Sequence, residues 1–325
     1  MCELIVNVSV AIGIDLGGTN LKGAAVDRDG RILTKEAHSI GGLDPDAVLA
    51  DMVDLIDRLL ADASLDRSRL AGVGVGTPGP LSHRTGRIIR AANLPGWVDV
   101  PIRDRLGEML QTPIVLDNDA NAAAFGEFWV GAGRGQDDLV MLTLGTGVGG
   151  GVVLDGRILH GHFENAAELG HMIVAVDGLP CSCGQRGCLE QYASAGAVAR
   201  RVVSAIKEGK PSALFDAVGK GGLIDAEQVV QCAKAGDPLC LRIWDEACLY
   251  LAAACINIQH AFNPACVVLG GGMSEAGDFL IDRVTDHVSR QRWKLHDDLP
   301  TITLPELGYD AGVIGAAGLV WQQIG

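Results

Sequence analysis

The sequence predicts an α/β protein built from two similar halves, and an internal repeat carries most of this prediction. Residues 12–26 and residues 141–154 each follow the pattern strand, glycine loop, strand, and the same run Asp-Gly-Arg-Ile-Leu comes next, at 29–33 and at 155–159. Such a short match can arise by chance, because Asp-Gly is a common hairpin turn. Its equal placement after two glycine loops favours an internal duplication. We therefore expect two halves that face each other across a cleft, each with its own glycine hairpin.

The elements of the first half follow from hydrophobic periodicity. Short apolar runs between glycine turns indicate strands of a meander at residues 8–14, 22–26 and 31–36. A helix should follow, with Asp44 as its N-cap and Pro45 in its first turn. Later apolar runs predict buried strands at 70–76 and 114–116 and a helix at 120–129. No low-complexity linker separates the halves, so we place the domain boundary near residue 118.

The composition excludes several classes of protein. With 325 residues, 48% of them hydrophobic, the chain suits two domains with a sizeable core and is unlike a disordered protein. The net charge of −14 argues against a nucleic-acid partner, because such partners are held by Lys and Arg. The apolar run at residues 8–14 is too short to span a bilayer, and no signal peptide is visible. We expect a cytoplasmic protein without a membrane partner.

The first glycine loop, Asp15-Leu-Gly-Gly-Thr-Asn20, has the residues that a phosphate tail requires. Gly17 and Gly18 would let backbone N–H groups approach closely, and Thr19 would add a hydroxyl donor. Asp15 could hold the hydrated Mg²⁺ that accompanies ATP. The alternative is a tight hairpin turn that needs glycine for its positive φ.

The second loop, residues 144–151, is too rich in glycine for a simple turn; its candidate phosphate-binding residues are Gly145, Thr146, Gly147 and Gly149. A Rossmann fingerprint would open a helix, whereas Val152 to Leu154 continue as a strand, so that interpretation fails. A third cluster, with Gly270 and Gly271, ends a strand and could lie against adenosine. Its alternative is a strand-to-helix connector.

Polar residues follow the buried strand at 114–116, in the run Asn118-Asp-Ala-Asn121. Asp119 could be an ordinary N-cap of the next helix. Ligands also bind at the carboxyl ends of strands in α/β sheets, which favours a functional role. Glu168, His171 and Glu190 are the other polar residues placed beside Gly and Cys in the middle of the chain.

His171 with Cys181, Cys183 and Cys188 offers one imidazole and three thiols, a ligand set typical of structural zinc. The alternative is three unligated loop thiols, which would be prone to oxidation. Nine Cys is an odd number, so a disulfide framework is not expected. Cys248 and Cys255 lie on a stripe of helical spacing and should be core residues.

Together these motifs resemble the ROK (repressor, open reading frame, kinase) family of sugar kinases and repressors, from residue 12 to about residue 318. The motifs that carry the resemblance occur in the family's order: Asp15–Thr19, Gly76–Gly79, Asn118–Asn121, Leu144–Gly151, Glu168–His171 and Cys181–Glu190. Residues 92–97 with 100–102 look most similar to bacterial glucokinases. The resemblance implies the actin-like ATPase fold, with two ribonuclease-H-like α/β domains around a central cleft. The domains would be residues 1–118, completed by a C-terminal helix at 311–325, and residues 119–310.

The resemblance also implies residue roles in a sugar kinase that phosphorylates a hexose, glucose above others, at its 6-hydroxyl with ATP and Mg²⁺. Asp119 would be the general base. The sugar hydroxyls would be bound by Asn93, Asn118, Glu168, His171 and Glu190, together with Asp119. Phosphates and metal would be held by Asp15, Gly17, Gly18, Thr19, the loop Gly145–Gly151, Gly270 and Gly271. His171 and the three Cys residues would hold a structural zinc ion, and we expect a homodimer or a higher homo-oligomer.

Two alternatives remain beside a glucose kinase. One is a kinase of N-acetylmannosamine or N-acetylglucosamine. Residues 162–167 depart from the small Gly/Ala residues usual in the family, and Phe163 and Glu164 could reshape the site near the first two sugar carbons, which puts glucose itself in question. The other is a sugar-responsive repressor, which would carry an N-terminal helix-turn-helix domain, whereas the kinase-like core here starts at about residue 8. The sugar-site residues also count against a non-catalytic actin-like ATPase. The sequence leaves open which hexose is preferred and whether polyphosphate can replace ATP.

Overall fold

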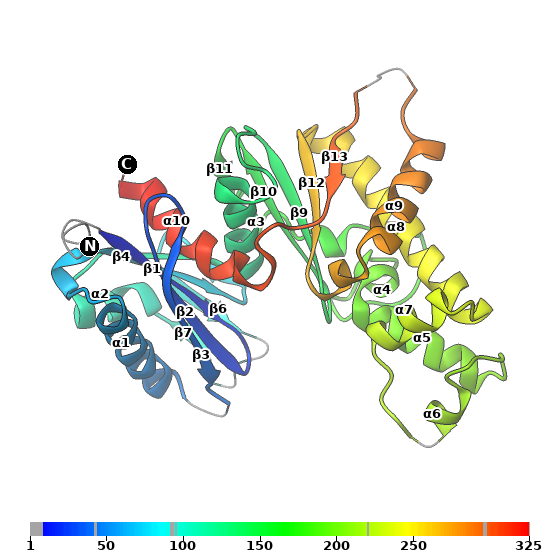
Figure 1. The fold of residues 1–325 in the computed structure, drawn as a ribbon, viewed down its shortest axis with the longest axis horizontal. Coiled ribbons are helices and arrows are strands. Elements are labelled where there is room, and N and C mark those ends of the chain that lie inside the picture. The colour runs from blue at the N-terminus through cyan, green and yellow to red at the C-terminus, as the bar shows by residue number, and fades with distance from the viewer. Residues whose placement is uncertain are drawn as a thin grey trace, which may run out of the picture. The chain divides into compact units, whose positions relative to one another are not determined.

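The chain is described here by a computed structural model that covers residues 9–41, 44–91, 94, 96–219, 221–294 and 298–324 (Figure 1). It forms two compact units. Unit 1 comprises Met1–Asp137, Gly151–Ala166 and Glu306–Gly325, and unit 2 comprises Asp138–Gly150 and Ala167–Pro305. The expected boundary near residue 118 and these units divide the chain at different positions, since residues 119–137 and 151–166 fall in unit 1.

Unit 1 is built on a five-stranded sheet in the order β3-β2-β1-β4-β8. Its strands are β1 Val10–Leu16, β2 Asn20–Val26, β3 Ile32–Ser39, β4 Leu70–Thr77 and β8 Ile114–Asn118. The first three strands pair antiparallel, and β1, β4 and β8 pair parallel. Because β1, β4 and β8 run in one direction, the carboxyl ends of β1 and β8 lie at the same edge of the sheet.

Helices cover both faces of this sheet. They are α1 Pro45–Asp62, α2 Ile102–Leu110, α3 Asp119–Val130 and α10 Ala311–Ile324. Alternate residues of β1 point to opposite faces, so Ile12 and Ile14 share a core with α1 and α2, whereas Ala11 packs with Val313 and Ala317 of α10. Asp44 caps α1, accepting the N–H of Ala47 at 2.9 Å, as the sequence predicts.

Helix α10 lies unusually close to the elements it packs on, because glycine stands at the points of approach. A Cβ atom at Gly74 of β4 would collide with the carbonyl group of Ala316, and one at Gly315 would collide with the carbonyl group of Ala122 in α3. Both positions therefore exclude every side chain larger than hydrogen. The apolar helix α10 is buried along most of its length.

A second five-stranded sheet has the order β11-β10-β9-β12-β13. Its strands are β9 Leu139–Leu144, β10 Val148–Leu154, β11 Arg157–Ile158, β12 Cys266–Gly270 and β13 Thr301–Thr303. The repeat found in the sequence thus has a structural counterpart, because β9, β10 and β11 take the places in this sheet that β1, β2 and β3 take in the first. The parallel pairs β9–β12 and β12–β13 correspond in the same way to β1–β4 and β4–β8.

The remaining elements complete the two units. Unit 1 also has η1 Arg67–Arg69, η4 Gly308–Asp310 and a small sheet of β5 Leu81–Ser82, β6 Arg87–Arg90 and β7 Val98–Val100. Unit 2 has η2 Leu169–His171, α4 Glu190–Ala193, α5 Ala195–Lys207, α6 Phe215–Gly219, α7 Ala226–Lys234, α8 Pro238–Phe262, η3 Gly272–Ala276 and α9 Asp278–Gln291.

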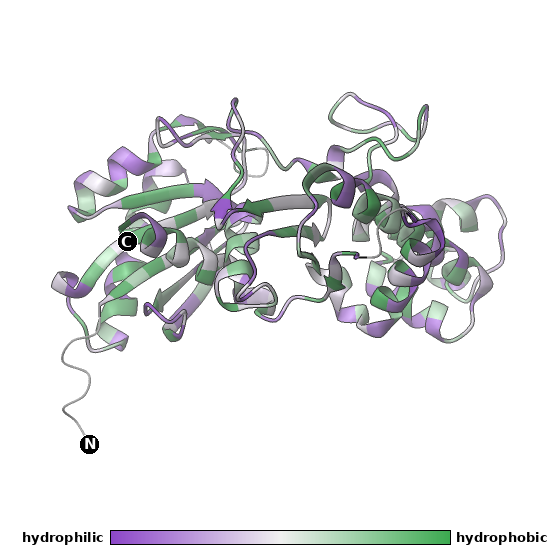
Figure 2. Cartoon of the chain, turned by 90° about the horizontal axis from the view of Figure 1, so that it is seen from above, coloured by the Kyte–Doolittle hydropathy of each residue, from purple (hydrophilic) through white to green (hydrophobic). Residues whose placement is uncertain are grey.

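Apolar residues concentrate on the strands and on the buried sides of the helices, and hydrophilic residues lie on exposed helix faces and loops (Figure 2). Cys248 and Cys255 are buried in α8, which confirms their prediction as core residues. In the part of the chain that the structure describes, no helix is both long and apolar enough to cross a membrane.

Candidate active site and metal-binding clusters

The first glycine loop joins β1 to β2 in unit 1. The N–H of Gly17 donates to the carbonyl of Asn20 at 2.9 Å, and the carbonyl of Thr19 accepts the N–H of Ile40 at 2.8 Å, so the loop is held from both sides. Gly17 does not have a φ in the left-handed region. The hairpin alternative, which requires glycine for a positive φ, therefore does not explain Gly17.

Asp15 lies near the end of β1 with its side chain partly exposed, opposite Lys22 in the β1–β2 register. Its carboxylate is 3.5 Å from the Lys22 ammonium group. On its other side a Cβ atom at Gly312 would be 3.5 Å away, so this neighbour adds no side chain of its own. The carboxylate is accordingly accessible beside the loop that the sequence assigns to phosphate.

Asn118 and Asp119 stand where β8 ends and α3 begins. Asn118 is the N-cap, since its Oδ1 accepts the N–H groups of Ala120 at 2.9 Å and Asn121 at 3.3 Å. The alternative role of Asp119 as N-cap is therefore wrong, and Asp119 is the first residue of the helix. The partly exposed Asp119 carboxylate sits at a helix N-terminus, whose dipole favours the ionised form of an acid.

The second glycine loop joins β9 to β10 in unit 2. The carbonyl of Gly145 accepts the N–H of Ala195 at 2.9 Å, which fixes the loop, and Thr146 at its tip is exposed. A Cβ atom at Gly145 would have no described neighbour within 4 Å, and its φ is not left-handed. Neither packing nor backbone strain requires glycine there, so its absence of a side chain serves to leave the backbone open. The loop leads into a strand, β10, and not into a helix.

Glu190, the first residue of α4, is tied to this second loop. Its Oε2 accepts the N–H of Val148 at 3.0 Å, and a Cβ atom at Gly147 would collide with the same carboxylate. Sequence reasoning assigned Glu190 only to the sugar. The structure shows that one of its oxygens also holds the candidate phosphate loop, a pairing across 42 residues that no local motif reveals.

The glycine cluster after β12 has a structural reason of its own. Gly271 has φ +81°, and a Cβ atom there would lie 2.7 Å from the backbone N and O of Leu144. The connector alternative therefore accounts for Gly271 by itself. Gly270 is buried at the end of β12.

His171, Cys181, Cys183 and Cys188 come together in unit 2, with their ligand atoms all within 4.8 Å of one another. The Sγ of Cys181 is 3.8 Å from Nδ1 of His171, and the Sγ atoms of Cys183 and Cys188 are 3.6 Å apart. In a tetrahedral site with zinc–sulfur bonds of about 2.3 Å, neighbouring ligands are about 3.8 Å apart. The four side chains therefore have the spacing that a zinc ion requires.

The thiols of this cluster differ in acidity. Burial opposes ionisation of Cys181, but hydrogen bonds from the Cys183 backbone, from the neighbouring thiols and from Gln191 outweigh it and lower the pKa of Cys181 to about 7. Burial and the same neighbours raise the pKa of Cys188 to about 12. Packing these thiols together without a cation thus favours one thiolate at the expense of another, and a divalent cation would relieve this conflict.

Two other predicted regions give a partial result. Asn93 lies outside the described residues. Glu168 is exposed, and its carbonyl accepts the N–H of His171 at 3.0 Å. In unit 1, Phe163 is 81% exposed, and the Glu164 carboxylate lies 2.5 Å from Nε of Arg84.

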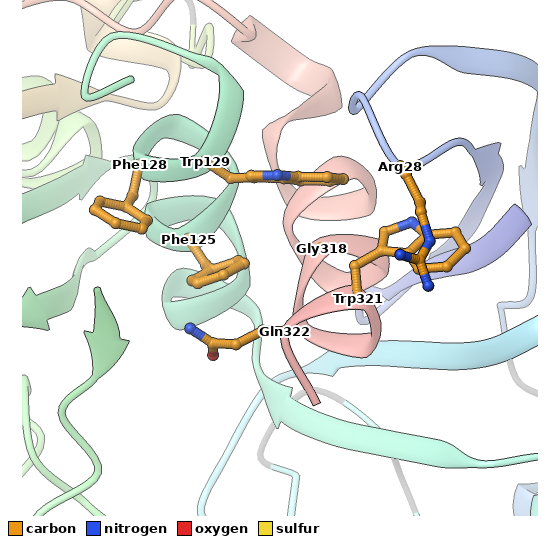
Figure 3. Close-up of a pocket in the computed structure, with 7 residues that line it drawn as sticks. All are labelled: Arg28, Phe125, Phe128, Trp129, Gly318, Trp321 and Gln322. Carbon is orange, nitrogen blue, oxygen red and sulfur yellow. The ribbon is translucent and has the colours of Figure 1, made fainter. Parts of the chain in front are cut away.

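The structure also shows two features that the sequence did not suggest. His83, Asp117 and His160 meet in unit 1, although they are far apart in the sequence and carry no recognisable spacing. A cavity of about 320 Å³ opens between α3 and α10 (Figure 3), lined by Arg28, Phe125, Phe128, Trp129, Gly318, Trp321 and Gln322. This cavity includes none of the predicted site residues.

Comparisons with known proteins identify the family and agree with the fold described above. A family model described as the ROK family matches residues 11–323. A glucokinase from Halalkalibacterium halodurans is 40% identical over 96% of this chain and 95% of its own length. A ROK hexokinase structure from Thermus thermophilus has a TM-score of 0.83 at 33% identity, covering 97% of this chain and 99% of that chain. A ROK family glucokinase from Streptomyces griseus, solved with glucose and AMPPNP, has a TM-score of 0.78 at 32% identity, covering 97% of this chain and all (100%) of that chain.

Proposed function

The chain belongs to the ROK family, and from this premise we propose that it transfers the γ-phosphoryl group of ATP to the 6-hydroxyl of glucose. The observation that carries the proposal is the match, over 96% of the chain, to a protein named as a glucokinase. A structural relative that binds glucose and an ATP analogue has the same fold over 97% of the chain. The fold is therefore that of the actin-like ATPases, and the protein is a sugar kinase that uses ATP with a divalent cation.

Asp119 is the proposed general base. In phosphoryl transfer to an alcohol, a carboxylate accepts the proton of the attacking hydroxyl, while most of the catalysis comes from positioning and charge stabilisation. Asp119 is the first residue of α3, and the dipole at a helix N-terminus favours the carboxylate form that can accept such a proton. Asn118 is the N-cap of α3, and Asp119 also accepts the N–H of Ala120, at 2.9 Å, through Oδ1.

The two hairpin loops are the proposed phosphate-binding elements. Gly17, Gly18 and Thr19 would act in unit 1, and Gly145, Thr146, Gly147 and Gly149 in unit 2. The open backbone at Gly145 supports this role, because an N–H group without a neighbouring side chain can approach a phosphate oxygen. Asp15 would hold the Mg²⁺ of ATP through water. Gly270 and Gly271 would border the adenosine.

The sugar hydroxyls are proposed to be bound by Asn93, Asn118, Asp119, Glu168, His171 and Glu190. His171 can serve both zinc and sugar because its ring has two nitrogen atoms. Nδ1 faces the thiols, 3.8 Å from Cys181, which leaves Nε2 to carry the proton. A zinc ion on Nδ1 would fix this tautomer, so Nε2–H would donate to a sugar hydroxyl.

We propose that the zinc site of His171, Cys181, Cys183 and Cys188 is structural. Three thiolates and one imidazole complete a tetrahedral zinc ion and leave no open position for a substrate. The chain between Cys181 and Glu190 is short, so an ion there would fix both His171 and the start of α4.

An assay of hexoses with ATP tests the proposed function. ADP release should be fastest with glucose, and 6-deoxyglucose should give no product but should inhibit competitively, because it lacks only the acceptor hydroxyl. Phosphorylation of 6-deoxyglucose would place the transfer at another hydroxyl. Absence of sugar-dependent ADP release across the panel would reject the kinase assignment.

A further inference from the structure

A second cluster of metal-binding side chains lies in unit 1 and shares no residue with the cysteine site of unit 2. His83 follows β5, Asp117 is in β8 and His160 follows β11, and one ligand atom from each lies within 4.8 Å of the others. The two imidazole rings lie against each other, with centroids 3.7 Å apart and ring planes tilted by 41°. Both rings face the same carboxylate, which is 4% exposed.

The hydrogen bonding of His83 leaves a lone pair directed at this carboxylate. Nδ1 of His83 is 3.1 Å from the carbonyl of Leu116, which can only accept, so Nδ1 carries the proton. Nε2 of the neutral ring is then a bare acceptor, 3.8 Å from Oδ1 of Asp117. A lone pair opposite a carboxylate is stabilised by a cation placed between them.

Asp117 and His160 have the supporting contacts that metal ligands require. Oδ1 of Asp117 accepts the N–H of Asn118 at 2.7 Å and Nδ2 of Asn121 at 2.9 Å, and Oδ2 is 2.8 Å from Nε2 of His160. Metal-bound imidazoles usually donate their second N–H to a carbonyl, as His83 does, and metal-bound carboxylates are themselves hydrogen-bonded. The His160 side chain is 34% exposed, which gives an ion a route from solvent.

We propose that His83, Asp117 and His160 form a binding site for a divalent transition-metal ion such as Zn²⁺ or Co²⁺. Imidazole nitrogens suit these ions, whereas Mg²⁺ requires oxygen ligands. Ligands bonded at about 2.0–2.1 Å in a tetrahedral site are about 3.3 Å apart. The Asp117 carboxylate lies 2.8 Å from Nε2 of His160 and 3.8 Å from Nε2 of His83, so the two distances lie on either side of that value. On binding, His160 would take the tautomer with its proton on Nδ1, the proton exchanging through solvent, so that Nε2 offers its lone pair to the ion, and water would complete the coordination.

Cobalt titration of the full-length, zinc-loaded protein tests this site, with Co²⁺ alone as the probe. The wild-type chain should bind an additional equivalent of Co²⁺ with the weak visible bands of nitrogen and oxygen ligands. The intense near-ultraviolet bands of Co²⁺–thiolate should not grow with it. His83→Gln and His160→Gln should each raise the Kd for this equivalent at least about tenfold. Because Co²⁺ would stabilise only the folded chain, it should also raise the Tm of the wild type and not of the variants.

His287→Gln is the matched control, since His287 also pairs with a carboxylate, at 3.1 Å from Asp245, but belongs to no metal-ligand cluster among the residues that the structure describes. It should bind the additional Co²⁺ as the wild type does. Equal binding by the wild type and His83→Gln would overturn the site, as would an additional equivalent with thiolate bands. If the variants do not fold, anomalous scattering from Co²⁺-soaked wild-type crystals decides. A peak between His83 and His160 supports the site, and its absence at saturating Co²⁺ overturns it.

Discussion

At the residue scale, the sequence offers two roles for Asp119, a general base and the N-cap of a helix. An Asp at the start of a helix is often its N-cap, but the N-cap of α3 is Asn118. The sequence alone could not separate these residues, because both are good N-caps and they are adjacent. The backbone path at the end of β8 decides between them, and that path depends on the whole sheet.

Asp119→Asn tests the proposed base. The amide keeps the shape of the side chain but cannot accept the hydroxyl proton, so kcat should fall by roughly 10²–10⁴-fold, or about 3–5 kcal/mol. Glucose binding should weaken much less, since the other hydroxyl contacts remain. Steady-state kinetics together with a glucose-binding measurement check both parts.

Asp104→Asn is the control for that experiment. Asp104 is also an acid in the first turn of a helix, α2, and its removal should leave kcat unchanged. Near-normal turnover in Asp119→Asn would show that the base assignment is wrong.

At the scale of single elements, the loop that carries Cys181, Cys183 and Cys188 has few apolar contacts to order it without a metal ion. Leu179 is 42% exposed and Val176 is 87% exposed, so the loop lacks a hydrophobic core of its own. Cys183→Ser removes one of the four ligands and should therefore release zinc. The loop should then loosen, because zinc binding at structural sites of this type contributes roughly 10–16 kcal/mol to folding. The sugar KM should rise more than the ATP KM. Elemental analysis and substrate titrations measure the two effects.

Cys232→Ser serves as the control for the zinc experiment, because Cys232 lies in α7, away from the ligand cluster. It should keep both the metal and the sugar KM. Active wild-type enzyme that contains no zinc, after purification without chelator, would refute the structural site.

The packing of α10 gives a second prediction at this scale. Gly315→Ala places a Cβ atom against the carbonyl of Ala122 and should lower the free energy of unfolding by about 1–3 kcal/mol. Gly107→Ala, in α2, meets only Ile114 at 3.9 Å and should be neutral or stabilise by up to about 1 kcal/mol. Denaturant unfolding of the two variants compares them. Equal stabilities would show that α10 does not pack as closely as described.

The strands and helices were largely predictable, since their residues alternate or recur with a regular period. The expected helix at 120–129 is α3 Asp119–Val130, and the expected strand at 70–76 is β4 Leu70–Thr77. The pairing of Glu190 with Val148 and the meeting of His83, Asp117 and His160 were not predictable. These contacts join distant residues through the sheet topology, and the sequence contains no spacing that encodes them.

At the scale of the whole molecule, we expect residues 162–167 to affect which sugar the protein prefers. The resemblance to the family implies small Gly/Ala residues at the positions of Phe163 and Glu164, so we expect a bulky acetamido group at the second sugar carbon to be disfavoured. Glucose should then have a higher kcat/KM than N-acetylglucosamine or N-acetylmannosamine. Parallel kinetics with the three sugars check this, and faster turnover of N-acetylmannosamine would move the protein to the acetamido-sugar kinases. The expected homo-oligomer stays a prediction, which light scattering can test.

The central claim, transfer of phosphate from ATP to the 6-hydroxyl of glucose, is tested most directly by ³¹P NMR of the reaction mixture. Wild-type protein with ATP, Mg²⁺ and glucose should produce glucose 6-phosphate and ADP in equal amounts, and omission of glucose should largely abolish ADP formation. A sugar phosphate with the phosphoryl group on another carbon, or ADP and inorganic phosphate without any sugar phosphate, would contradict the account.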